Sequence, residues 1–140
     1  MTTRMFRTVV LAAVAAVTLA ACSTESTASS ESTAPPAFDG SHVSESAFAL
    51  AVDQPGVTVL DVRTPAEFAE GHLPGAVNIN VEDPGFPAEV AALDPDADYA
   101  VYCRSGNRSR VAVDFMSQQG VTQTVGLEGG ISAWKGDVER

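Results

Sequence analysis

The sequence predicts an α/β domain whose mainly parallel sheet carries helices on both faces. Short apolar runs alternate along the chain with segments of helical spacing, which is the order in which parallel sheets are built. The run 57–62 is mostly apolar, as in strands that are buried on both sides. Capping residues and glycines divide these segments from one another.

The first expected helix follows Ser44, a residue type whose side chain caps helix starts. It runs to about Asp53, and its apolar face carries Phe48, Ala51 and Val52. The buried strand comes after it in the chain.

The second expected helix has a strong start signal. Thr64 fits the N-cap, Pro65 the first helical position, and Glu67 the position that completes a capping box. We expect Gly71 to end this helix.

The remaining segments continue the alternation of strand and helix. They are a strand at 75–80, a helix at 86–93, a strand at 99–102, a helix at 109–119, a strand at 123–125 and a helix that starts at 131–134. The 109–119 helix has one apolar stripe of Val111, Ala112, Phe115 and Met116, and Gly120 fits the position after its end.

The N-terminal residues differ in composition from the rest of the chain. Arg4 and Arg7 precede an apolar run at 8–20 of about 13 residues, shorter than the ~20 that cross a membrane. We therefore expect residues 1–21 to be a signal peptide. The run ends in a sequence that resembles the lipobox of bacterial lipoproteins, in which the cysteine is acylated: Leu19-Ala20-Ala21-Cys22.

This resemblance implies an exported protein that acyl chains alone hold on a cell membrane or envelope. An ordinary cleaved signal with an incidental Cys22 is the alternative. Residues 22–37 are rich in Ser, Thr, Ala and Glu, and we expect them to form a flexible tether. Residues 38–140 are then the single folded domain, of roughly 100 residues.

Charge and cysteine usage narrow the function. The chain has a net charge of −10, and loss of the signal leaves 6 basic against 18 acidic residues, which argues against nucleic acid as a partner. Yet Arg104, Arg108 and Arg110 crowd around Cys103. If Cys22 carries lipid, Cys103 is a single thiol; a disulfide between the two cysteines is the alternative.

The loop after the 99–102 strand is where chemistry is expected. It runs from Cys103 to Arg108 and leads into a helix, so its N–H groups, the positive end of the helix dipole and the arginines favour a thiolate. Gly106 supplies the backbone freedom of a tight turn. A buried, inert Cys103 beside solvated arginines is the alternative interpretation.

Three segments that together span most of residues 41–135 make the chain resemble a single-domain rhodanese, a sulfurtransferase of the thiosulfate type. They are Asp61-Val62-Arg63 continuing through Glu67-Phe68 to Gly71-His72-Leu73-Pro74-Gly75-Ala76-Val77-Asn78-Ile79; Cys103-Arg104-Ser105-Gly106-Asn107-Arg108-Ser109; and Leu127-Glu128-Gly129-Gly130-Ile131-Ser132-Ala133-Trp134.

The resemblance implies a five-stranded parallel sheet and a persulfide formed on Cys103. It also implies a binding loop for the sulfur and its small anionic donor, with a thiol or cyanide as acceptor and no cofactor: Arg104, Ser105, Gly106, Asn107 and Arg108. Asp61 and Arg63 are expected to form a buried pair, and His72 to support a turn rather than act as a base.

Of the other residues, His42 is expected to be isolated at the surface and Trp134 to lie in the core. No group of residues has the spacing of a metal site.

Two other functions remain as alternatives. Phosphatases or arsenate reductases of the same fold have a loop one residue longer, with arginine six positions after the cysteine, where this chain has Ser109. A non-catalytic persulfide carrier or sensing module would keep the same cysteine and work with a dedicated partner.

Overall fold

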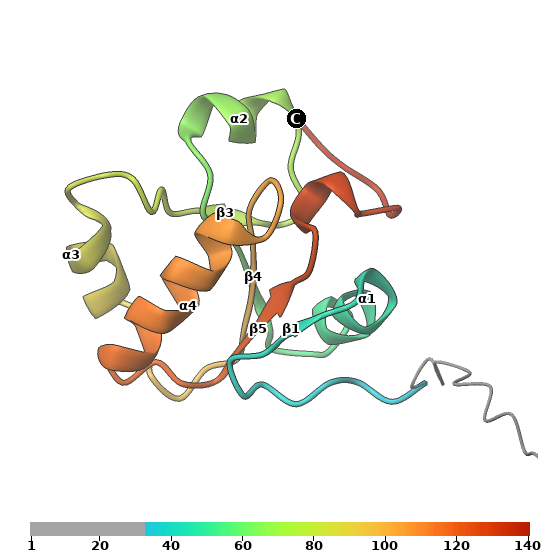
Figure 1. The fold of residues 1–140 in the computed structure, drawn as a ribbon, viewed down its shortest axis with the longest axis horizontal. Helices are drawn as coiled ribbons and strands as arrows, with labels where there is room; N and C mark the ends of the chain where they lie inside the picture. The colour runs from blue at the N-terminus through green and yellow to red at the C-terminus, as the bar shows by residue number, and fades with distance from the viewer. Residues whose placement is uncertain (1–32) are drawn as a thin grey trace, which may run out of the picture.

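Five parallel strands form one sheet in the order β1-β5-β4-β2-β3. The computed structural model describes residues 33–140, and Figure 1 shows the strands at its centre. The strands are β1 (His42–Val43), β2 (Thr58–Asp61), β3 (Val77–Asn78), β4 (Tyr99–Tyr102) and β5 (Thr124–Leu127). The predicted fold class is therefore confirmed, and all strand pairings are parallel.

Four α-helices and one 3-10 turn surround the sheet in the described part of the chain. They are α1 (Glu45–Val52), α2 (Pro65–Glu70), α3 (Phe86–Ala91), α4 (Asn107–Gln118) and η1 (Gly130–Ser132). Helices α3 and α4 lie on one side of the sheet and α1 on the other, while α2 lies beyond the strand ends (Figure 1).

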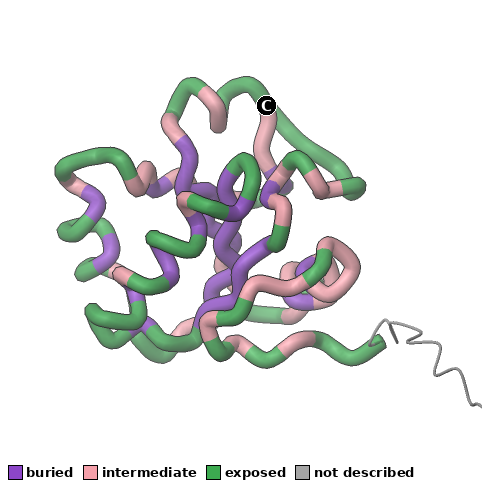
Figure 2. Tube along the Cα trace, in the orientation of Figure 1, coloured by how far each residue is buried: buried purple, intermediate pink, exposed green. Residues whose placement is uncertain are grey.

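The central strands divide their side chains between two cores. On β4, Val101 packs with the α3 and α4 core, whereas Ala100 and Tyr102 pack with the α1 core. This alternation follows from the two-residue period of a strand, and both faces are buried because helices cover both. Figure 2 shows the resulting buried centre of the domain, with exposed loops around it.

The predicted starts of the first two helices are confirmed. Ser44 caps α1 by accepting a hydrogen bond from the Ala47 N–H (3.4 Å). Thr64 and Glu67 form the expected capping box at α2, and Gly71 ends that helix. These signals are local, so the sequence alone was enough to find them.

Helix α4 differs from its prediction in its start and its buried face. It begins at Asn107, two residues early, because Gly106 adopts a φ of 97° and serves as its N-cap. Val111 is 62% exposed, and Val113 is buried in its place. The buried residues of α4 form one stripe of helical spacing: Ser109, Ala112, Val113 and Met116.

Three other elements were predicted wrongly in extent or missed. The terminal helix is a single 3-10 turn that begins after Gly129, whose φ is 75°. Strand β3 is shorter than predicted, and β5 extends further, to Leu127. Strand β1 has two residues, too few to leave a periodic pattern, and pairing with β5 is what makes it a strand.

Several sequence predictions fall outside the described residues. These are the signal peptide at 1–21, the lipidated Cys22 and most of the tether at 22–37. Within residues 33–140, no helix is long and apolar enough to cross a membrane.

The strand order has a switch point between β2 and β4. These strands are neighbours, but the chain leaves β2 toward β3 and leaves β4 toward β5, in opposite directions. Such a switch point is where open α/β sheets bind ligands. Asp61 ends β2, and Cys103 directly follows β4, so both lie at this switch point.

Candidate active site

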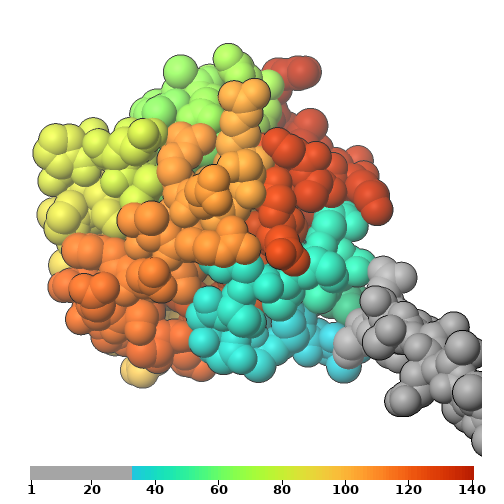
Figure 3. Space-filling view, viewed as in Figure 1, coloured from blue at the N-terminus to red at the C-terminus, as the bar shows by residue number. Residues whose placement is uncertain are grey.

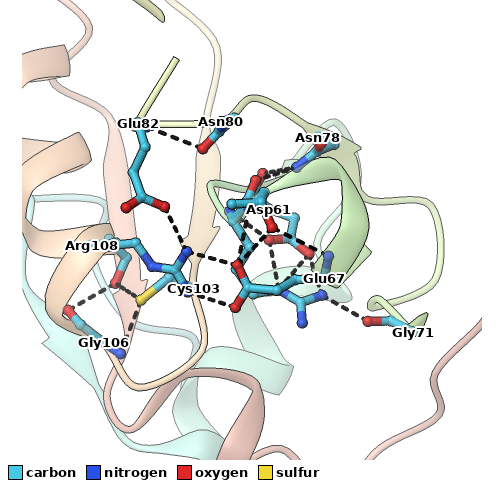
Figure 4. A network of polar contacts seen from close by, with 12 residues as sticks. Asp61, Glu67, Gly71, Asn78, Asn80, Glu82, Cys103, Gly106 and Arg108 are labelled. Atoms are coloured by element: carbon cyan, nitrogen blue, oxygen red, sulfur yellow. Dashed lines mark hydrogen bonds and ion pairs between the residues drawn. The ribbon is translucent and has the colours of Figure 1, made fainter. Parts of the chain in front are cut away.

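Cys103 lies at the base of the loop between β4 and α4. The Gly106 N–H donates a hydrogen bond to its sulfur (3.1 Å), and the Ser109 Oγ lies 3.6 Å from the same atom. The residue is 1% exposed. Figure 4 shows the sulfur facing the nitrogen of Gly106 across the loop. The loop therefore holds the thiol by backbone N–H groups in a site with little water.

Two opposing effects set the pKa of the Cys103 thiol. Burial is the largest single influence and opposes ionisation, but the N–H and hydroxyl of Ser109 and the N–H groups of Ser105 and Gly106 favour the thiolate. Together these hydrogen bonds lower the pKa below its ordinary value. A lowered pKa makes the thiolate, which is the nucleophile, more abundant near neutral pH.

The two glycines after β5 allow the C-terminal segment to close against the cysteine loop. The Ile131 N–H donates to the Cys103 carbonyl (2.8 Å), and the Ser132 N–H donates to the Arg104 carbonyl (3.1 Å). A Cβ on Gly130 would lie 2.4 Å from the Cys103 carbonyl oxygen, closer than the atoms can pack. This contact favours glycine at position 130, and a φ of 75° favours glycine at position 129.

Asp61 and Arg63 form a buried ion pair at the carboxyl end of β2. The Arg63 Nη2 lies 2.6 Å from the Asp61 Oδ2, and the side chains are 6% and 0% exposed. The same Nη2 donates to the Gly71 carbonyl (2.7 Å), which ties the end of β2 to the turn after α2. Removal of either partner would leave a buried charge, a loss of about 3–5 kcal/mol.

The turn after α2 is held by aromatic and polar contacts. The Leu73 N–H donates to the buried Tyr102 hydroxyl (3.0 Å), next to Cys103 in the chain. The His72 ring stacks on Phe68 at a centroid distance of 3.7 Å, and its Nδ1 lies 3.0 Å from the Phe68 carbonyl oxygen. The His72 Nε2 lies 3.7 Å from a Glu139 oxygen. Both ring nitrogens of His72 therefore have partners. Nδ1 contacts the end of α2, and Nε2 faces a residue near the end of the chain.

The arginines around the loop have different surroundings. Arg108 forms a two-point ion pair with Glu67 (2.7 and 2.8 Å) and a further contact with Glu82 (3.1 Å). Its guanidinium lies between these carboxylates in Figure 4. Arg104 is exposed, and its guanidinium makes no hydrogen bond or ion pair within residues 33–140. Of these two predicted anion-binding side chains, Arg104 is therefore the uncompensated charge.

The other predicted loop residues share one short segment. Ser105 and Asn107 are exposed, whereas Gly106 is buried. A Cβ on Gly106 would lie 3.3 Å from the Gly129 nitrogen, so close packing as well as its φ of 97° favours glycine. Figure 3 shows α4 and its loop between the segment around α2 and the C-terminal segment, coloured green and red.

His42 is the site residue that sequence reasoning missed. It was expected to be isolated at the surface, but it is half-buried and its Nε2 lies 2.9 Å from the Ser109 Oγ. The partners are separated by 67 positions in the chain, so only the pairing of β1 with β5 brings them together. No local signal could have found this contact. Residues 33–140 contain no group of three His, Cys, Asp or Glu side chains placed to hold a metal ion.

Known proteins resemble this chain in sequence and in fold. The family model for the Rhodanese-like domain matches residues 37–137. A sulfurtransferase from Allochromatium vinosum is 38% identical over 91 residues, which cover 65% of this chain and 83% of that protein. The thiosulfate sulfurtransferase GlpE of Pseudomonas aeruginosa is 36% identical over 80 residues, covering 57% of this chain and 71% of GlpE.

A solved structure gives the same result for the fold. The rhodanese-related protein of Thermoplasma volcanium superimposes with a TM-score of 0.62 at 34% identity, covering 70% of this chain and 96% of that one. The chain thus belongs to the rhodanese-like family, and its relatives include sulfurtransferases.

The Glu67–Arg108 ion pair makes the stability of the loop region depend on acid pH. The hydrogen bond from Arg108 lowers the pKa of Glu67 from 4.5 to about 2. Its contribution is therefore fully present above about pH 4.5 and is lost as the pH falls toward 2. Glu67→Gln should lower the free energy of unfolding at pH 7 by on the order of 1–2 kcal/mol, since solvent screens a part-exposed pair.

Urea unfolding of wild type and variant at pH 7, 4, 3 and 2 measures this difference. We expect the gap between the two proteins to close toward pH 2. Glu70→Gln, on the exposed end of the same helix, is the matched control and should give no pH-dependent gap. A Glu67→Gln gap that stays constant from pH 7 to pH 2 would contradict the prediction.

Proposed function

We propose that the protein is a sulfurtransferase that carries sulfane sulfur as a persulfide on Cys103. The observation that carries the proposal is the hydrogen bond of 3.1 Å from the Gly106 N–H to a buried Cys103 sulfur whose pKa is lowered. N–H groups aimed at one point favour negative charge there, and the outer sulfur of a persulfide is an anion at neutral pH.

The reaction consists of two exchanges at sulfur. The Cys103 thiolate attacks the outer sulfur of thiosulfate; a new S–S bond forms, the old one breaks, and sulfite leaves with the electron pair. A thiolate acceptor, or cyanide, then attacks the outer sulfur of the persulfide and releases the Cys103 thiolate. The loop N–H groups stabilise negative charge at the start and end of each exchange.

Phosphatase or arsenate reductase chemistry has weaker support. Those reactions need an arginine free to bind a tetrahedral dianion, whereas Arg108 is already paired with Glu67 and Glu82. Two carboxylates near the loop also oppose a doubly charged substrate.

Cys103→Ser tests the reaction. Intact mass spectrometry of the full chain after thiosulfate should show one added sulfur atom, located on the Cys103 peptide and removed by cyanide. Cys103→Ser should show no added sulfur and lose turnover, because the serine hydroxyl stays protonated near neutral pH. Cys22→Ser, which changes the other cysteine, is the control. It should keep both the added sulfur on Cys103 and the turnover.

Two results would count against the proposal. Turnover that survives Cys103→Ser would exclude the persulfide route. A persulfide that forms on Cys103 without turnover to thiols or cyanide would make the protein a carrier rather than an enzyme.

We propose that Arg104 attracts the anionic donor. Its side chain is exposed, and within residues 33–140 its guanidinium has no carboxylate partner. Arg104→Ala should raise KM for thiosulfate on the order of fivefold, the effect of about 1 kcal/mol for an exposed charge contact. Steady-state kinetics with Lys135→Ala as the matched control measure it, since Lys135 is an exposed cation on a different segment. An equal rise in KM for both variants would contradict a local role.

We also propose that Cys22 carries a lipid and anchors the domain outside the cytoplasm. The support is the sequence of residues 1–22, with its basic start, short apolar run and small residues before the cysteine. Labelled palmitate should enter the wild-type protein in cells, and Cys22→Ala should abolish the label because the acylated thiol is gone. Ser23→Ala is the control that should keep it, and a label retained by Cys22→Ala would refute lipidation at this residue.

A further inference from the structure

A chain of polar contacts leads from Cys103 through Ser109 of α4 to His42 of β1. The Ser109 hydroxyl is 3.6 Å from the Cys103 sulfur and 2.9 Å from the His42 Nε2. It also donates to the Gly106 carbonyl (3.0 Å). Ser109 is 0% exposed, so its hydroxyl exchanges partners only among these three groups.

The fold makes room for the imidazole of His42. Strand β1 pairs with β5 so that His42 lies beside Gly126. A Cβ on Gly126 would lie 2.3 Å from the imidazole ring, which means that any larger residue would displace His42. The contact between His42 and Ser109 therefore depends on a glycine in the middle of β5, where a strand would otherwise carry a side chain.

Solvent reaches His42 but not Cys103. His42 lines an open pocket of about 340 Å³ with Gly40, Arg110, Val113 and Asp114. In Figure 3 the segment of β1 lies beside α4 on the visible surface. The His42 Nδ1 makes no hydrogen bond with residues 33–140, so pocket water is the partner available to it. Cys103, by contrast, is 1% exposed.

We propose that His42 is a positioning residue that receives the Cys103 proton through the Ser109 hydroxyl and keeps it, so that an imidazolium stabilises the Cys103 thiolate. This role rests on the proposed function, because it supplies the thiolate that attacks the sulfur donor. A residue of β1 thus takes part in the chemistry of a loop that starts at Cys103, 61 positions later in the chain.

The proton transfer balances in one concerted step. The thiol S–H points to the Ser109 oxygen, and the transfer starts when the Ser109 O–H turns from the Gly106 carbonyl to the His42 Nε2. The thiol proton moves to the Ser109 oxygen while the hydroxyl proton moves to Nε2. This leaves a thiolate, a neutral hydroxyl that now donates to the thiolate, and an imidazolium. The imidazolium keeps this proton, and its positive charge stabilises the thiolate.

The charges around His42 keep its imidazole ready to accept. Burial lowers the pKa of His42, and the cation of Arg110 on α4 lowers it further. The carboxylates of Glu128 after β5 and Asp114 on α4 act in the opposite direction but do not reverse the change in pKa. The imidazole is thus neutral at pH 7 and able to take a proton.

The pH dependence of Cys103 alkylation tests this role. Iodoacetamide reacts with the full chain, and mass spectrometry of the Cys103 peptide separates this thiol from Cys22. His42→Gln should move the rise of the rate to higher pH, since glutamine bonds to Ser109 but takes no proton. At any pH below the pKa, a thiol whose pKa is higher by about 1 reacts roughly tenfold more slowly, because the thiolate fraction falls by that factor. A profile that overlies the wild type would overturn the proposal.

Rescue by added imidazole separates proton transfer from a merely structural role. His42→Ala opens space next to the pocket, and imidazole should restore its alkylation rate at neutral pH. The same imidazole should leave wild type and Ser109→Ala unchanged, because the latter lacks the hydroxyl. A slow His42→Ala that imidazole does not restore, with an unchanged melting temperature, would also overturn the proposal.

Failure of this inference can be told from failure of the proposed function. Alkylation needs the thiolate but no sulfur donor. If His42→Gln moves the profile to higher pH while thiosulfate adds no sulfur to Cys103, the relay stands and the sulfurtransferase proposal fails. If sulfur transfer proceeds and the profile stays in place, only the relay is wrong.

Discussion

The ion pair between Asp61 and Arg63 joins the parts of the structure that make up the site. Arg63 holds the Asp61 carboxylate on one side and the Gly71 carbonyl on the other, while its guanidinium lies 5.7 Å from the centre of the Tyr102 ring. Through these contacts the end of β2, the turn after α2 and the end of β4 keep one arrangement. Because a lone buried charge is costly, neither partner can move without the other. Cys103 directly follows this fixed strand end, so the pair determines where the loop starts.

The electrostatics of the loop come mainly from its backbone. The three arginines near Cys103 suggest that side chains give the site its positive charge. Arg108, however, is paired with Glu67 and Glu82. Arg110 faces Glu128 at 4.0 Å. What reaches the sulfur is the N–H of Gly106 together with the groups of Ser109. A chain with net charge −10 can thus favour a thiolate locally, because N–H dipoles a few ångströms away outweigh distant, solvated carboxylates.

The parts of the fold that were predictable depend on neighbours in sequence. The capping box of Thr64 and Glu67 and the cap by Ser44 follow from residue types at fixed spacing. The Cys103 loop was found because its strand, glycine and helix are consecutive. Val111 was assigned to the wrong face because Val111 and Val113 are both apolar, and only packing against the sheet decides which of them is buried. Strand β1 was missed because two residues leave no period, although β5 makes them part of the sheet.

The sequence by itself determined the fold class and the place of Cys103 in a glycine-containing loop between a strand and a helix, since both follow from local geometry and from residue types at short spacing. The tertiary structure alone decided which charges face which partners. It paired Arg108 with carboxylates from α2 and from the segment before α3, and it brought His42 to Ser109 across a glycine in β5. Such contacts join residues that are tens of positions apart, so they exist only when the sheet has set its strand order.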